Sequence, residues 1–232
     1  EEAQGRLLSL VKSERGSGSR RKAAFYSNSG TVYTSYQAAG SDLKQQLMNR
    51  ETTAVINIRV SGQINTEETF SAVTSAVFSA AITHTKVPVE GDYIRYEYGG
   101  YEAGGKLTYS SDTNTTLCVI TFTPQYYTTA AQETQLTSTV NSILSSLNLN
   151  GKSDYQKIRA IYNYLCANVT YDYTNLNNTS YKLKYTAYAA LVNHTAVCQG
   201  YAVAFYRLCL SSGVDTRVIT SSEMVHAWNI AA

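Results

Sequence analysis

The sequence predicts an α+β protein, because segments with helical periodicity and short β-branched segments follow one another along most of its length. Two capping-box patterns, Asn65 with Glu68 and Ser153 with Gln156, each begin an apolar-periodic segment and indicate helix N-termini. The β-branched runs are interrupted by glycine pairs, as expected for strands of an antiparallel sheet. At 232 residues, the chain is long enough for one large domain or two small ones.

The composition excludes some classes of protein. There are 19 Lys and Arg against 17 Asp and Glu, a balance that argues against a nucleic-acid partner. No window approaches the ~18 consecutive apolar residues of a membrane span, so none is expected. The 20 tyrosines suit half-solvated β surfaces, because tyrosine can bury its ring and leave its hydroxyl in water.

Three stretches divide the chain. Residues 1–29 are rich in charge, glycine and serine and predict a flexible leader. Residues 30–127 predict an N-terminal α+β module, and residues 128–232 predict a core in which helices precede a final pair of strands. The elements expected in the N-terminal module are helices over 35–50 and 65–84 and strands over 53–60, 92–111 and 113–124.

The core is expected to begin with helices within 129–151 and 153–172. In the second of these, the apolar face consists of Ile158, Ile161, Tyr162 and Leu165. Cys166 stands beside that stripe and is therefore expected to be a buried small hydrophobe.

The four cysteines are expected to be free thiols. They form no CxxC pair and no zinc-finger cluster, so no structural metal and no cofactor is expected. Cys198 and Cys209 are eleven positions apart (209 − 198) on one expected helix, roughly 16 Å, which excludes a disulfide between them.

Cys198 is expected to begin that helix. Ala202, Phe205 and Leu208 follow at helical spacing, and Gly213 stands where a helix end favours a left-handed residue. A cysteine in a first helical turn lies near unpaired N–H groups and the positive end of the helix dipole, and both favour the thiolate.

His226 lies in the second of two strands expected over 215–221 and 224–230. His226, Trp228 and Ile230 share one face, and if that face packs on the helix, His226 is directed at it. A neutral imidazole within hydrogen-bond reach could take the thiol proton, as in the Cys/His pairs of acyl transfer. Spacing alone leaves open that both residues are structural.

The stretch "YTAYAALVNHTAVCQGYAVAFYRLCLSSGVDTRVITS", followed by "HAWN", resembles the core of the transglutaminase-like superfamily, particularly its bacterial members. The resemblance covers about residues 153–232. It implies a papain-like fold in which the cysteine opens a helix packed on an antiparallel sheet that carries the histidine. It also implies that Cys198 is the nucleophile and that His226 is the base and later the acid.

Two departures from the family pattern affect the expected site. The orienting acid of the family follows the histidine on the next strand, whereas this sequence ends six residues after His226 (232 − 226). The core is therefore expected to be truncated at its C-terminus, with no third triad acid in this chain. Some members also supply a tryptophan before the cysteine for the oxyanion hole; here, Gln199, Tyr188 and Asn193 are the candidates for oxyanion or substrate contact.

The resemblance implies a thiol enzyme that attacks peptide or side-chain amide carbonyls through a Cys thioester. Hydrolysis, as in a peptidase or amidase, is slightly favoured over crosslinking to an amine. The implied partner is a protein or peptide substrate, and the implied location is secreted or on a bacterial cell surface. Two alternatives stay open: a catalytically incomplete transglutaminase-like scaffold, and a cell-surface binding protein that acts through the N-terminal module. The sequence does not reveal the oligomeric state.

Overall fold

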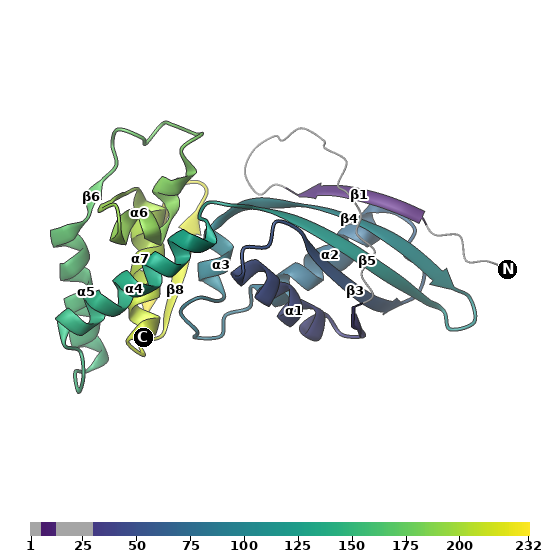
Figure 1. Ribbon diagram of the computed structural model, residues 1–232, viewed down its shortest axis with the longest axis horizontal. Helices are drawn as coiled ribbons and strands as arrows, with labels where there is room; N and C mark the ends of the chain where they lie inside the picture. Colours follow the sequence, from purple (N-terminus) through teal and green to yellow (C-terminus); the bar gives the residue numbers. More distant parts are fainter. Residues whose placement is uncertain (1–5, 13–29) are drawn as a thin grey trace. The chain divides into compact units, whose positions relative to one another are not determined.

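A computed structural model describes residues 6–12 and 30–232 of the chain (Figure 1). It confirms the α+β class and divides the chain into two compact units. One unit comprises the described residues up to Thr83 together with Gly99–Gln125, and the other comprises His84–Tyr98 and Tyr126–Ala232.

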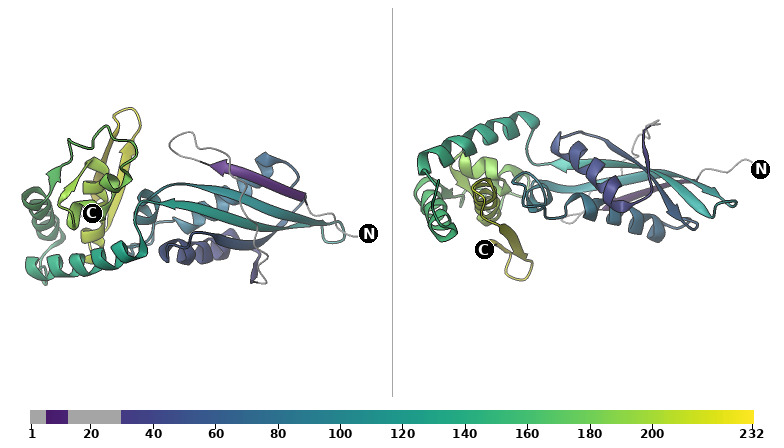
Figure 2. Two further views of the ribbon diagram at one scale, coloured as in Figure 1. Left: turned by 45° about the horizontal axis from the view of Figure 1, so that its top comes forward. Right: turned by 90° about the horizontal axis from the view of Figure 1, so that it is seen from below.

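The first unit contains a five-stranded sheet and two helices (Figures 1 and 2). The sheet is mostly antiparallel: β1 pairs with β4 and β3 with β5 in that sense, whereas the short β2 runs parallel to β3. The strand order is β1-β4-β5-β3-β2, with bounds Arg6–Lys12 for β1, Val32–Tyr33 for β2, Ala54–Ser61 for β3, Tyr98–Ser110 for β4 and Thr115–Tyr126 for β5.

Helices α1 (Tyr36–Met48) and α2 (Glu67–Ala81) cross closely, because a Cβ at Gly40 would stand only 2.5 Å from that of Ala80. Phe78 of α2 stacks on Tyr101 of β4, with ring centroids 4.5 Å apart. The helix therefore covers the sheet with its apolar face.

The second unit is built around α7 (Cys198–Ser211). Its core joins Val203, Tyr206 and Leu208 of α7 to apolar residues of the preceding helices, such as Leu136 and Ile161. The remaining elements are α3 (Asp92–Tyr96), α4 (Ala130–Leu147), α5 (Asp154–Asn168), η1 (Lys182–Tyr185), α6 (Ala187–Leu191), the parallel pair β6 (Thr170–Tyr171) and β7 (Thr195–Ala196), and the antiparallel pair β8 (Thr216–Ser221) and β9 (His226–Ala231).

Local signals at several helix ends are confirmed. Ser153 and Gln156 form the expected capping box of α5, and Gly213 has the expected positive φ of 85°. The capping box of α2 lies one residue later than predicted, at Thr66 and Thr69, because Thr66 is the residue with extended backbone before the helix.

The structure differs from the sequence interpretation in three further places. Residues 92–96 form a helical turn rather than a strand, because Gly91 has a φ of 61° and turns the chain just before them. Residues 6–12 of the expected leader form β1; residues 1–5 and 13–29 lie outside the described residues. Segment His84–Tyr98, expected in the N-terminal module, packs with the second unit.

Candidate active site

Cys198 is the first residue of α7 and is half-buried. The preceding Val197 has extended backbone and provides no side-chain cap. Gly200 lets the start of the helix lie against neighbouring chain, since a Cβ there would stand 2.7 Å from the Cβ of Ala196 and 2.8 Å from the carbonyl oxygen of Lys184. The thiol is thus held at the positive end of a fixed helix, as the sequence predicts.

His226 begins β9 and pairs with Ser221 of β8. Nδ2 of Asn229 donates to the carbonyl oxygens of Ala202 in α7 at 2.9 Å and of Arg217 in β8 at 3.2 Å. The Asn229 side chain therefore ties the strand that carries His226 to the helix that carries Cys198.

Strand β9 packs on α7 through the face that carries Ala227 and Asn229. Ala227 is buried and Asn229 bonds to the helix, whereas His226 and Ile230 are exposed. The side chains that face α7 are thus a small methyl group and a hydrogen-bonding amide. The sequence left open which face of β9 packs on α7; Ala227 and Asn229 lie against the helix, and His226 and Trp228 line the hollow beside it.

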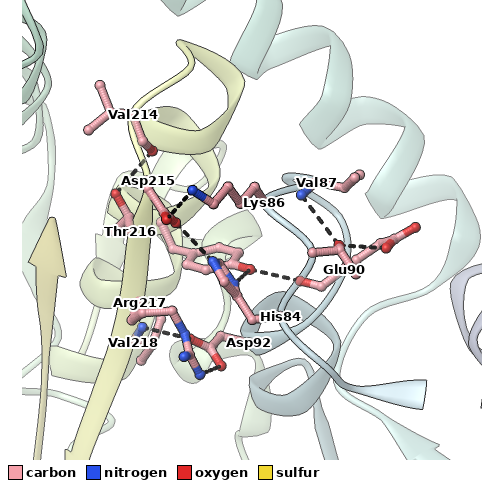
Figure 3. Close-up of polar contacts among 12 residues, drawn as sticks. His84, Lys86, Val87, Glu90, Asp92, Val214, Asp215, Thr216, Arg217 and Val218 are labelled. Carbon is pink, nitrogen blue, oxygen red and sulfur yellow. Dashed lines mark hydrogen bonds and ion pairs between the residues drawn. The ribbon is translucent and has the colours of Figure 1, made fainter. Parts of the chain in front are cut away.

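Strand β8 is anchored by Asp92 of α3, which is buried (Figure 3). Its carboxylate accepts hydrogen bonds from Nε of Arg217 at 2.7 Å, from Nη2 of Arg217 at 3.0 Å and from the backbone N–H of Val218 at 2.9 Å. A buried carboxylate with three donors is well satisfied. It fixes the strand on which β9 depends.

Cys198 and His226 line one hollow of about 580 Å³ in the second unit. The imidazole of His226 also stacks on the ring of Trp228, with centroids 6.1 Å apart and planes at 21°. The complete lining consists of Ile158, Tyr162, Leu165, Cys166, Tyr171, Cys198, Tyr201, Ala202, Phe205, His226, Ala227, Trp228, Asn229 and Ala231.

The four thiols have different surroundings. Burial raises the pKa of Cys118 and of Cys209 to about 12, which keeps both protonated and inert at neutral pH. Cys166 is exposed, so the expectation that it is buried is wrong: Leu165, its neighbour on α5, takes the buried position instead. Cys198 alone among the four stands at the first turn of a helix in the same hollow as a histidine.

Tyr171 is a site residue that sequence reasoning missed. It lines the hollow from β6, where it pairs with Ala196 just before α7. Burial raises the pKa of the Tyr171 hydroxyl and the neighbouring Cys198 thiol raises it further, whereas a hydrogen bond from the Cys198 backbone lowers it. The Tyr171 hydroxyl therefore lies near Cys198, in the hollow that both residues line.

The other residues predicted for substrate or oxyanion contact lie outside the lining of the hollow. Gln199 is 5% exposed, and its Nε2 donates to the carbonyl oxygens of Tyr96 at 2.9 Å and of Tyr185 at 3.4 Å. The hydroxyl of Tyr188 donates to Oε1 of Gln135 at 2.8 Å. Asn193 is exposed next to His194, which has a positive φ of 58°.

A second polar cluster joins His84 to the start of β8 (Figure 3). Nε2 of His84 lies 2.8 Å from Oδ1 of Asp215, and Nζ of Lys86 lies 2.9 Å from Oδ2 of the same carboxylate. Tyr206 is fully buried and donates its hydroxyl hydrogen to the carbonyl oxygen of Glu90 at 2.9 Å. These bonds secure segment His84–Tyr98 to the second unit.

Residues 6–12 and 30–232 contain no group of three His, Cys, Asp or Glu side chains that could hold a metal ion. Within the same ranges, no helix is both long and apolar enough to cross a membrane.

The fold and the candidate site define an α+β domain with a cysteine at the start of its central helix and a histidine on an adjacent strand. Residues 141–231 match the family model described as transglutaminase-like superfamily. This match agrees with the resemblance to that superfamily seen in the sequence.

A solved structure described as "Crystal structure of a TGase" is similar to this chain. The two are 14% identical, with a TM-score of 0.38, and the match covers 77% of this chain and 48% of the other. This chain thus aligns with about half the length of that structure. No curated protein matches the chain.

Proposed function

We propose that the second unit is a thiol acyl-transfer enzyme with Cys198 as nucleophile and His226 as its base. The observation that carries this proposal is that the two residues line one hollow, although they come from a helix start and a separate strand. A half-exposed thiol at a helix N-terminus and a histidine in the same hollow are the elements of nucleophilic catalysis.

The proposed reaction has two stages. His226 takes the thiol proton, and Sγ of Cys198 attacks the carbonyl carbon of a peptide or side-chain amide. The C–N bond then breaks, the amine leaves with the proton from the imidazolium, and a thioester remains on Cys198. An acceptor then attacks the thioester carbon and gives its proton to His226, the C–S bond breaks, and the departing thiolate takes the proton back from the imidazolium.

In this proposal, two groups stabilise the oxyanion. The first is the backbone N–H of Cys198 at the start of α7, and the second is the hydroxyl of Tyr171 beside it. Donors that are already oriented toward the developing charge supply a large part of the rate in acyl transfer. Tyr171 takes this role in the proposal in place of Gln199, whose amide is engaged elsewhere.

We favour water over an amine as the acceptor. His226 is exposed to solvent, so a water molecule can reach the base that would activate it. The proposed substrate is a protein or peptide, and the proposed location is secreted or on the cell surface.

A second candidate function is a binding scaffold that keeps the fold without turnover. Among the described residues that line the hollow, none is Asp or Glu. His226 therefore has no carboxylate in that lining to fix its tautomer, and in acyl-transfer enzymes such a group contributes strongly to the rate.

Iodoacetamide labelling followed by mass spectrometry separates the two functions. We expect half-buried Cys198 to be alkylated at neutral pH at least about tenfold faster than Cys166, the exposed thiol among the four, because a paired thiolate reacts faster than a free thiol. His226→Ala should remove the difference. A Cys166→Ser chain is the matched control and should keep fast labelling of Cys198.

Equal, slow labelling of both thiols, unaffected by His226→Ala, would contradict the enzyme proposal and favour the scaffold. The acceptor is determined with the same protein: an unfolded protein substrate is offered with a fluorescent primary amine. Release of new peptide ends without incorporation of the amine supports hydrolysis, and incorporation supports crosslinking.

A further inference from the structure

The hollow beside Cys198 has an almost wholly apolar and aromatic lining. Ile158 and Leu165 of α5, Phe205 of α7 and Trp228 of β9 all contribute to it. Among the described residues of the lining, none is Asp, Glu, Lys or Arg. A charged group that entered would lose its hydration and gain no partner of opposite charge.

The hollow is also large enough and open enough for part of a substrate. Its volume of about 580 Å³ is within the range of sites that enclose small ligands. Tyr162 of its lining is 57% exposed, so the lining reaches the surface of the unit. Tyr171 and Tyr201 stack with centroids 6.3 Å apart, and they continue the aromatic surface along α7 from Cys198.

We propose that this hollow receives a bulky apolar or aromatic side chain of the acyl donor, close to the amide that Cys198 attacks. The inference rests on the proposed thiol chemistry and adds the class of substrate to it. The acyl donor is the expected occupant, because its amide must reach Cys198 and Cys198 lines the same hollow as the apolar side chains. An amide flanked by phenylalanine, tyrosine or leucine fits this lining, and one flanked by an acidic or basic residue does not.

Peptidyl chloromethyl ketones that differ only in the side chain next to the reactive carbon test this inference. Each alkylates a thiol with loss of chloride, and the rate of Cys198 labelling is measured in the Cys166→Ser chain and divided by the iodoacetamide rate. Phenylalanyl and leucyl probes should react at least about tenfold faster than aspartyl and lysyl probes on this relative scale.

Two variants test whether the lining of the hollow causes the preference for apolar probes. Tyr162→Ser removes a wall of the hollow at an exposed position and should lower the ratio of phenylalanyl to aspartyl rates several-fold. Tyr155→Ser is the matched control, because Tyr155 lies on the same helix, is 69% exposed and lies outside the lining; the ratio should not change.

The outcomes distinguish this inference from the function on which it rests. Equal relative rates for all four probes, with iodoacetamide still selective for Cys198, would overturn the substrate class and leave the thiol chemistry standing. The same holds if Tyr162→Ser leaves the ratio unchanged. Loss of selectivity toward iodoacetamide would overturn the thiol chemistry, and the substrate class with it.

Discussion

At the scale of single residues, Tyr171 is the side chain that the sequence did not point to and that the proposed mechanism uses. Its hydroxyl lies near Cys198, and in the proposed reaction it stabilises the charge on the carbonyl oxygen under attack. We expect Tyr171→Phe to weaken binding of a phenylalanyl peptide aldehyde, which forms a tetrahedral adduct with the thiol, by about tenfold to a hundredfold. Iodoacetamide labelling forms no oxyanion and should be unaffected. Tyr173→Phe, at an exposed neighbouring ring, is the control, and an unchanged aldehyde affinity in Tyr171→Phe would exclude the role.

At the scale of elements, the candidate site depends on how β9 is attached to α7. Asn229→Ala would leave the carbonyl oxygens of Ala202 and Arg217 without this donor. We expect the free energy of unfolding to fall by about 1 kcal/mol, the usual net contribution of such hydrogen bonds. Urea denaturation measures it, and Asn163→Ala, at an exposed position of α5, should change it by less than about 0.5 kcal/mol. If the two variants behave alike, Asn229 does not hold the strand.

These elements also show what the sequence could and could not predict. The start of α7 at Cys198 and its end before Gly213 were predictable, because both depend on spacing and backbone preferences within the segment itself. The contact of Tyr171 with Cys198 was not, because it requires β6 to pair with β7, some 25 residues further along the chain (196 − 171). Non-local pairing leaves no periodic signal in either segment.

The sequence pattern also could not predict which face of β9 packs on α7. A period of two separates the faces of a strand but does not say which face is buried. The sequence left the packing face open, and the structure buries Ala227 and bonds Asn229 to the helix. The helical turn over 92–96 was missed for a related reason, since Asp92 is satisfied by Arg217 and Val218, more than a hundred residues away.

At the scale of the whole molecule, the second unit is discontinuous in the chain. Segment His84–Tyr98 stands between elements of the first unit in sequence, yet it belongs to the second. Its two ends are held by separate bonds: His84 meets Asp215, and Oε1 of Glu97 accepts from the backbone N–H of Ala187 at 3.0 Å. The transglutaminase-like match begins at residue 141, so segment His84–Tyr98 of the second unit lies outside the matched residues.

The contact between His84 and Asp215 makes the stability of the second unit depend on pH under acidic conditions. A hydrogen bond from Lys86, and then one from His84, lower the pKa of Asp215 from 3.8 to about 2. The unfolded chain therefore binds this proton more readily, so the stabilisation is fully present above about pH 4 and is lost as the pH falls through about 2. Because the Asp215 side chain is 35% exposed, solvent screening should limit its contribution to less than about 1 kcal/mol.

We expect Asp215→Asn to reduce the slope of the unfolding free energy against pH between about pH 4 and pH 2. Trp228 is the one tryptophan in the sequence and lies in the second unit, so urea denaturation followed by its fluorescence reports on that unit. Asp112→Asn removes a carboxylate from the turn between β4 and β5 of the first unit and should leave the slope as in the unmodified chain. Identical slopes for all three proteins would show that the charge of Asp215 does not hold segment His84–Tyr98 in place.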